Sequence, residues 1–167
     1  IVATKAQSVD VFVWKVTNGV VNPTPQKYAF PVATPSYYWS VVPMPVGMTG
    51  YMGFFSTSAT NGLIWMNSTM GEVSRSSGVR TSGGDVITIN GRVYVAYTAY
   101  SGDQKGVMRI CDITDGKYNQ IFNYTMEASG ANGNSTASAC LMVKNNELYA
   151  VFGCTGSGLY FYRIACK

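Results

Sequence analysis

The clearest hydrophobic pattern in the chain lies between residues 85 and 126, where four short runs of β-branched and aromatic residues show rough alternation. These runs cover residues 85–89, 92–99, 106–113 and 118–124. The gaps between them hold turn-forming residues, namely Asn90-Gly91, Ser101-Gly102-Asp103 and Asp115-Gly116. Short alternating runs joined by such turns are typical of antiparallel strands connected by hairpins. The pattern therefore predicts a four-stranded antiparallel meander.

A sheet of this size cannot bury both of its faces alone, so further sheets of the same kind are expected to stack on it. Similar runs occur on both sides of the meander, at residues 9–16, 26–32, 40–45, 51–58, 62–67, 73–79, 137–143, 147–154 and 159–165, and residues 1–4 resemble the end of a strand. Pro43 and Pro45 have no N–H to donate, so the strand over residues 40–45 is expected to be irregular or to lie at an edge.

A Thr-x-Gly hairpin recurs at Thr17, Thr69 and Thr114, with spacings of 52 and 45 residues. Spacings of this size are typical of a repeat built from four strands. They divide the chain into units of about 1–34, 35–80, 81–128 and 129–167, with roughly three, four, four and three predicted strands.

The composition agrees with an all-β protein, because only 12% of the residues are charged while the chain holds 18 Gly and 12 Tyr. The net charge of +4 is spread along the chain, so no basic stripe indicates a nucleic-acid partner. The chain also has no run of eighteen apolar residues, so no transmembrane segment is predicted.

Two strings, Gly91–Tyr97 (GRVYVAY) and Glu147–Phe152 (ELYAVF), open the second strands of their units and precede third strands at 106–116 and 158–164. With these repeats, the chain resembles β-propeller proteins of uncertain function that gut Bacteroidetes secrete or anchor to lipid. The resemblance implies radially stacked four-stranded blades and an extracytoplasmic location. A β-sandwich is the structural alternative, because it also has short strands and regular turns. Three strands at each end predict a piece of a larger propeller, with the remaining blades supplied by the same gene product or a second copy.

The chain offers few groups for catalysis or metal binding, since it has no histidine and only eight acidic residues. Asp112 and Asp115 fall short of a calcium loop, and no feature brings Asp85 and Asp112 to the separation of a glycosidase pair. No metal or other cofactor is expected. Four cysteines allow up to two disulfides, but Cys111 and Cys140 sit in apolar runs and are interpreted as buried thiols.

The aromatic stretch Tyr37, Tyr38 and Trp39 is the candidate ligand-binding site, because it lies between two units and sugar rings bind to exposed aromatic faces. The alternative is that all three rings pack between sheets. Trp14 and Trp65 are interpreted as core residues. Arg109 and Arg163 interrupt apolar runs and are expected at a rim or central channel.

These features favour a non-catalytic binding module whose ligand is a glycan or a partner protein. The alternative is a propeller-type polysaccharide hydrolase or lyase with part of its active site on other blades.

Overall fold

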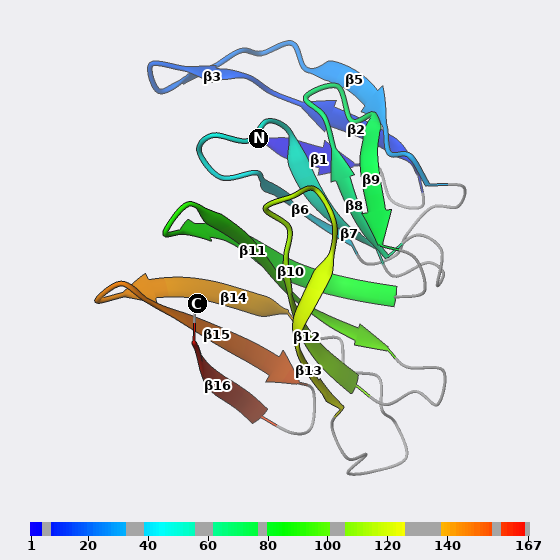
Figure 1. Cartoon of the computed structure of the whole chain (residues 1–167). Helices are drawn as coiled ribbons and strands as arrows, with labels where there is room; N and C mark the ends of the chain where they lie inside the picture. The colour runs from blue at the N-terminus through cyan, green and yellow to red at the C-terminus, as the bar shows by residue number, and fades with distance from the viewer. Residues whose placement is uncertain are drawn as a thin grey trace.

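The computed structural model describes residues 1–4, 8–32, 39–55, 62–76, 80–100, 106–125, 138–154 and 158–165. The described residues form antiparallel strands and no helix, which confirms the all-β prediction. Figure 1 shows the sheets following one another in chain order, from the N-terminal strands to the C-terminal ones.

Four sheets and one short ribbon make up this part of the chain. Sheet I contains β1 (Val2–Thr4), β2 (Asp10–Val13) and β5 (Gln26–Ala29), and the ribbon contains β3 (Val16–Thr17) and β4 (Val20–Val21). Sheet II contains β6 (Trp39–Pro43), β7 (Tyr51–Phe55), β8 (Leu63–Met66) and β9 (Glu72–Ser76). Sheet III contains β10 (Arg80–Ile89), β11 (Arg92–Tyr100), β12 (Gly106–Asp112) and β13 (Asn119–Thr125). Sheet IV contains β14 (Ala139–Lys144), β15 (Glu147–Cys154) and β16 (Gly158–Ile164).

Sheet III is the predicted meander, and its strands pair in chain order. The turn at Asn90-Gly91 has φ values of 52° and 73°, and the turn at Asn145-Asn146 has φ values of 53° and 61°. Asparagine and glycine tolerate this left-handed region, which two-residue hairpins of type I′ require at both positions. The turn residues therefore explain why β10 joins β11, and β14 joins β15, without a longer loop.

Two predicted strands differ clearly in extent from the observed ones. The first strand of sheet III begins at Arg80 rather than Asp85, because Gly83 and Gly84 hide its extension from a hydrophobic pattern. The strand predicted over residues 9–16 ends at Val13 and is followed by the separate strand β3. The strand that carries Pro43 lies at the edge of sheet II, as its missing N–H predicted.

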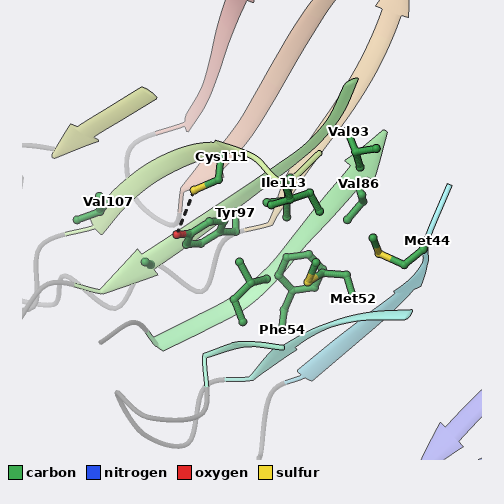
Figure 2. Close-up of a cluster of buried hydrophobic side chains, with 12 residues drawn as sticks. Met44, Met52, Phe54, Val86, Val93, Tyr97, Val107, Cys111 and Ile113 are labelled. Atoms are coloured by element: carbon green, nitrogen blue, oxygen red, sulfur yellow. Dashed lines mark hydrogen bonds between the residues drawn. The ribbon is translucent and has the colours of Figure 1, made fainter. Parts of the chain in front are cut away.

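Each sheet packs face to face on the next one through an apolar cluster. One cluster joins sheets I and II around Val11, Phe30, Phe55, Ile64 and Met66. A second joins sheets II and III around Met52, Phe54, Val95, Tyr97 and Cys111 (Figure 2). A third joins sheets III and IV around Tyr94, Met108, Ile110, Leu148 and Phe152. This order of consecutive meanders differs from the Greek-key sandwich alternative.

Polar groups also link neighbouring sheets. Arg75 Nη2 of sheet II donates to the carbonyl oxygen of Pro31 at 2.7 Å, next to sheet I. The Tyr118 hydroxyl, just before β13, donates to the carbonyl oxygen of Ser74 at 3.4 Å. The backbone N–H of Leu141 in β14 donates to Asp85 Oδ2 in β10 at 2.9 Å. These bonds fix how each sheet sits on its neighbour, beyond what apolar packing alone would specify.

Candidate functional site: the outer face of sheet IV

The predicted aromatic site is described only at Trp39, because Tyr37 and Tyr38 lie outside the described residues. Trp39 begins β6, is half-buried, and packs against the cluster between sheets I and II. Its ring centroid lies 5.5 Å from that of Phe30. This contact gives Trp39 a packing role, and glycan binding by the stretch stays a prediction.

The carboxylate of Asp112 is engaged in holding a hairpin together. Oδ1 accepts hydrogen bonds from the backbone N–H and the hydroxyl of Thr114, at 3.0 and 2.6 Å. Oδ2 accepts one from Arg92 Nε at 2.7 Å and also pairs with Arg92 Nη2. Burial alone would raise the pKa of Asp112, but these hydrogen bonds outweigh it and lower the pKa. Asp112 is therefore an ionised structural group.

Asp85 likewise has a structural role, because its two oxygens accept hydrogen bonds from the backbone N–H groups of Val86 and Leu141, each at 2.9 Å. A glycosidase pair of Asp85 and Asp112 would therefore need two carboxylates that already accept structural hydrogen bonds to act in catalysis as well. Among the described residues, no group of three or more His, Cys, Asp or Glu side chains could hold a metal ion.

The two arginines that interrupt apolar runs have neighbours on their own sheets. Arg109 Nε donates to Asn123 Oδ1 at 3.0 Å, across from β12 to β13. Arg163 Nη1 lies 3.3 Å from Glu147 Oε1, and 69% of the Arg163 side chain is exposed. Arg163 thus marks a solvent-exposed face of sheet IV.

Sheet IV has one buried face and one exposed face, because side chains alternate along its strands. Leu141, Leu148 and Phe152 point toward sheet III and are buried in the cluster between the two sheets. The residues between them on each strand point to the opposite face, because successive side chains of a strand alternate. Five side chains on that opposite face form what we call the outer patch: Met142, Tyr149, Val151, Leu159 and Phe161.

The outer patch is a contiguous surface by strand register. Val151 of β15 pairs with Phe161 of β16, and Tyr149 pairs with Met142 of β14. Leu159, Phe161 and Met142 are 67%, 70% and 45% exposed. Single exposed apolar residues are ordinary, but neighbouring ones on one sheet face make that face a candidate interaction surface.

The same positions in sheet III are buried. Tyr94 follows the Asn90-Gly91 turn as Tyr149 follows Asn145-Asn146, and Tyr94 is only 3% exposed. Two residues after Tyr94, Ala96 pairs with Ile110. Two residues after Tyr149, Val151 pairs with Phe161, so Ile110 and Phe161 hold equivalent positions.

By the same register, Met108 corresponds to Leu159. Met108 and Ile110 have no exposed surface, because sheet IV covers them. The outer patch therefore has the register of a buried interface without its cover among the described residues.

Charged groups border the patch. The Tyr149 hydroxyl donates to Glu147 Oε2 at 2.6 Å, and this bond raises the pKa of Tyr149. Glu147 in turn pairs with Arg163. An apolar centre with a hydrogen-bonded polar rim is the usual composition of a protein-binding surface.

The sequence prediction missed this surface. Its signal was present in the alignment of residues 92–97 with residues 147–152 and in the charged Arg163 within an apolar run. The hydrophobic pattern does not indicate which faces of each sheet are covered by a neighbouring sheet.

Two other predictions on side-chain burial were wrong. Cys140 is exposed, because it shares the outer face of β14 with Met142, whereas Cys111 is buried as predicted and both are free thiols. Trp14 follows β2 rather than lying in a strand and is only half-buried. Trp65 packs partly buried against the cluster between sheets II and III, in agreement with its predicted role.

Comparison with protein-family models and with curated proteins finds no match to this chain. In the part of the chain that the structure describes, no helix has the length and apolar character needed to cross a membrane.

Proposed function

We propose that this chain is a non-catalytic binding module whose partner is a protein, bound through the outer patch of sheet IV. The observation that carries the proposal is the exposure of Leu159 and Phe161 at register positions whose counterparts in sheet III are buried. Burying two such side chains contributes about 1.5–3 kcal/mol each, which would offset part of the free-energy cost of association.

A protein partner fits the patch better than a glycan does. Sugars combine flat apolar faces with many hydroxyl groups, and those groups need hydrogen-bond partners at the contact. The centre of the patch offers Met142, Leu159 and Phe161, which have no hydrogen-bonding groups suited to hydroxyls. Glycan binding through Tyr37, Tyr38 and Trp39 remains the second hypothesis, supported only by their composition.

The proposal includes a propeller-like arrangement of the sheets and an extracytoplasmic location. In support of radial packing, the first strands β6, β10 and β14 approach one another, with β10 contacting both of the others. A stack of paired strands that presents a preformed face is well suited to binding, because little order must be gained when the partner docks. The location rests on the resemblance to secreted propeller proteins.

A polysaccharide hydrolase or lyase is the less supported alternative. It requires a pair of carboxylates free to act as acid and base. Asp85 and Asp112 instead accept structural hydrogen bonds, so we expect their replacement to lower the free energy of unfolding whether or not the chain has any activity.

Site-directed photocrosslinking tests the proposed function. The variant Phe161→p-benzoylphenylalanine is exposed to light in the cells that make the protein, and the crosslinked partner is identified and purified. The variant with the same substitution at Val20, which is 70% exposed on β4, is the matched control. We expect Phe161→Asp to weaken the binary affinity for the purified partner at least tenfold and Val20→Asp to leave it unchanged. Equal crosslinking at both positions, or retention on polysaccharides that depends on Trp39, would contradict the proposal.

A further inference from the structure

The three inter-sheet contacts share one polarity. Every sheet has one face directed toward the sheets before it in the chain and one face directed toward the sheets after it. In each contact, the second kind of face packs against the first kind of face on the next sheet. Along the described chain, this leaves one face of each kind without a neighbouring sheet. They are the outer patch of sheet IV and the face of sheet I opposite to sheet II.

The second of these faces can be placed from the alternation along β2. Val11 and Val13 pack toward sheet II, so Asp10 and Phe12 point to the opposite side. The ring of Phe12 lies 6.3 Å from that of Trp14, and both side chains are only half-buried. Ala3 of β1 and Lys27 of β5 pair with Phe12 in register and share this side.

We propose that the outer patch binds this face of sheet I in a second copy of the chain, head to tail. The inference rests on the proposed protein-binding function and names its partner. It extends the observed stacking by one step, because sheet IV would meet sheet I of the second copy in the polarity with which sheet III meets sheet IV.

The two faces are chemically matched. Phe161 and Leu159 would lie against Phe12 and Trp14, and aromatic rings gain from tilted contacts in addition to the area they bury. Each face carries its own ion pair beside the apolar centre. Lys27 Nζ lies 2.8 Å from Asp10 Oδ2 on one face, and Arg163 pairs with Glu147 on the other. Because both pairs are internally neutral, stacking brings no excess of like charge together.

Coverage of the exposed faces favours a head-to-tail dimer over a patch-to-patch dimer. In a head-to-tail dimer with a two-fold axis, each copy gives its patch to the other and receives the other's patch on sheet I, so that all four faces are covered. A dimer that joined two outer patches would leave both sheet I faces in water.

Sedimentation equilibrium on the intact chain tests the proposal, over about 1 to 100 µM, the range in which micromolar association is visible. We expect the wild-type chain to dimerise reversibly. Phe161→Asp and Phe12→Asp should each weaken dimerisation at least tenfold, whereas Val20→Asp should not. An equimolar mixture of the two defective variants retains one intact interface, between sheet IV of the Phe12 variant and sheet I of the Phe161 variant. The mixture should therefore associate more strongly than either variant alone.

Two further variants keep the test valid if an aspartate perturbs a sheet. Leu159→Asp replaces the patch variant, and Ala29→Arg obstructs the sheet I face from an exposed position in register with Asp10. Circular dichroism and thermal unfolding verify that each variant is folded.

Each outcome decides the question. If Phe12→Asp and Ala29→Arg, the two sheet I variants, dimerise as strongly as the wild-type chain, the dimer forms by patch-to-patch pairing and the head-to-tail arrangement is wrong. A chain that stays monomeric at the highest concentration would overturn self-association altogether. If that monomer still binds another protein through Phe161, the proposed function stands and only the identity of the partner was wrong. If Phe161 takes part in no contact, both fail.

Discussion

Sheets III and IV use equivalent strand positions in opposite surroundings. In sheet III, Met108 and Ile110 are fully buried under the neighbouring sheet. In sheet IV, Leu159 and Phe161 hold the same register and are mostly exposed. The difference shows that a side chain's burial in this fold depends less on its position in the strand than on whether another described sheet covers it. Four experiments test this comparison, in order of decreasing expected effect.

The largest expected effect comes from truncating the two equivalent side chains. Ile110→Ala should lower the free energy of unfolding by about 2–5 kcal/mol, because it leaves a cavity between sheets III and IV. Phe161→Ala should change it by less than about 0.5 kcal/mol in dilute protein, since its ring is already in water. Urea unfolding of both variants at low concentration measures the two values. Equal losses would show that the outer patch is covered within a single chain.

Glycine replacement compares the space available for a side chain between two sheets with the space available on the outer face of sheet IV. A Cβ on Gly84 would lie 2.3 Å from Phe54 Cε1 and 2.4 Å from the carbonyl oxygen of Ala96. The backbone oxygen cannot rotate away, so Gly84→Ala should cost about 3 kcal/mol, the upper part of the overpacking range.

On the outer face, a Cβ on Gly153 would meet Leu159 Cδ2 at 3.5 Å and the carbonyl oxygen of Ser138 at 3.9 Å, both ordinary contacts. Gly153→Ala should be tolerated within about 0.5 kcal/mol, and thermal unfolding checks both. A destabilised Gly153→Ala chain would count against an open face there.

The Asp112 network predicts a pH dependence. Asp112→Asn removes the charged bond to Arg92 and should cost about 1.5 kcal/mol at neutral pH. Because the pKa of Asp112 is lowered in the folded chain, its stabilisation is present above the unfolded value and is lost as pH falls through the folded pKa.

The stability difference between wild type and Asp112→Asn should therefore shrink below pH about 4, the ordinary value for aspartate. Unfolding curves from pH 7 to pH 3 measure it. Asp115→Asn is the comparison, because Asp115 is exposed and lies outside the Asp112–Arg92 pair, while hydrogen bonds from the backbone N–H of Lys117 and the amide of Asn119 also lower its pKa. Its stability difference should also shrink as the pH falls. A difference that stays constant with pH would show that packing, not charge, explains the effect.

The smallest effect is expected at the rim of the outer patch. Tyr149→Phe removes the hydrogen bond to Glu147 but keeps the ring. Because this bond lies at the surface, we expect the stability of the monomer to change by less than about 0.5 kcal/mol. Any dimerisation should weaken more than the monomer does, since the bond becomes shielded from water on docking. Titration calorimetry of dimer dissociation checks this, and an unchanged dissociation constant would place Tyr149 outside the contact.

The sequence allowed the meander to be predicted because local chemistry specifies it. The left-handed turns at Asn90-Gly91 and Asn145-Asn146 and the alternation between them depend on neighbours in the chain. The extension of β10 to Arg80 was missed because Gly83 and Gly84 have no side chain to show a pattern. The outer patch was missed for another reason. The apolar residues on the two faces of sheet IV look alike, and only the stacking order reveals which face is covered.

The pairing of strands with their immediate successors has a consequence for how the chain folds. In sheets II, III and IV every strand pairs with the next one along the chain, so each meander closes only short loops. Short loops carry a small entropic cost, so hairpins between successive strands can form before the sheets pack on one another. Each sheet can therefore assemble while the chain is still being synthesised, with the preceding sheet already present as a template. Assembly in this order would proceed from the N-terminal sheet onward, and at every stage the newest sheet would expose one apolar face to whatever protein reaches it first.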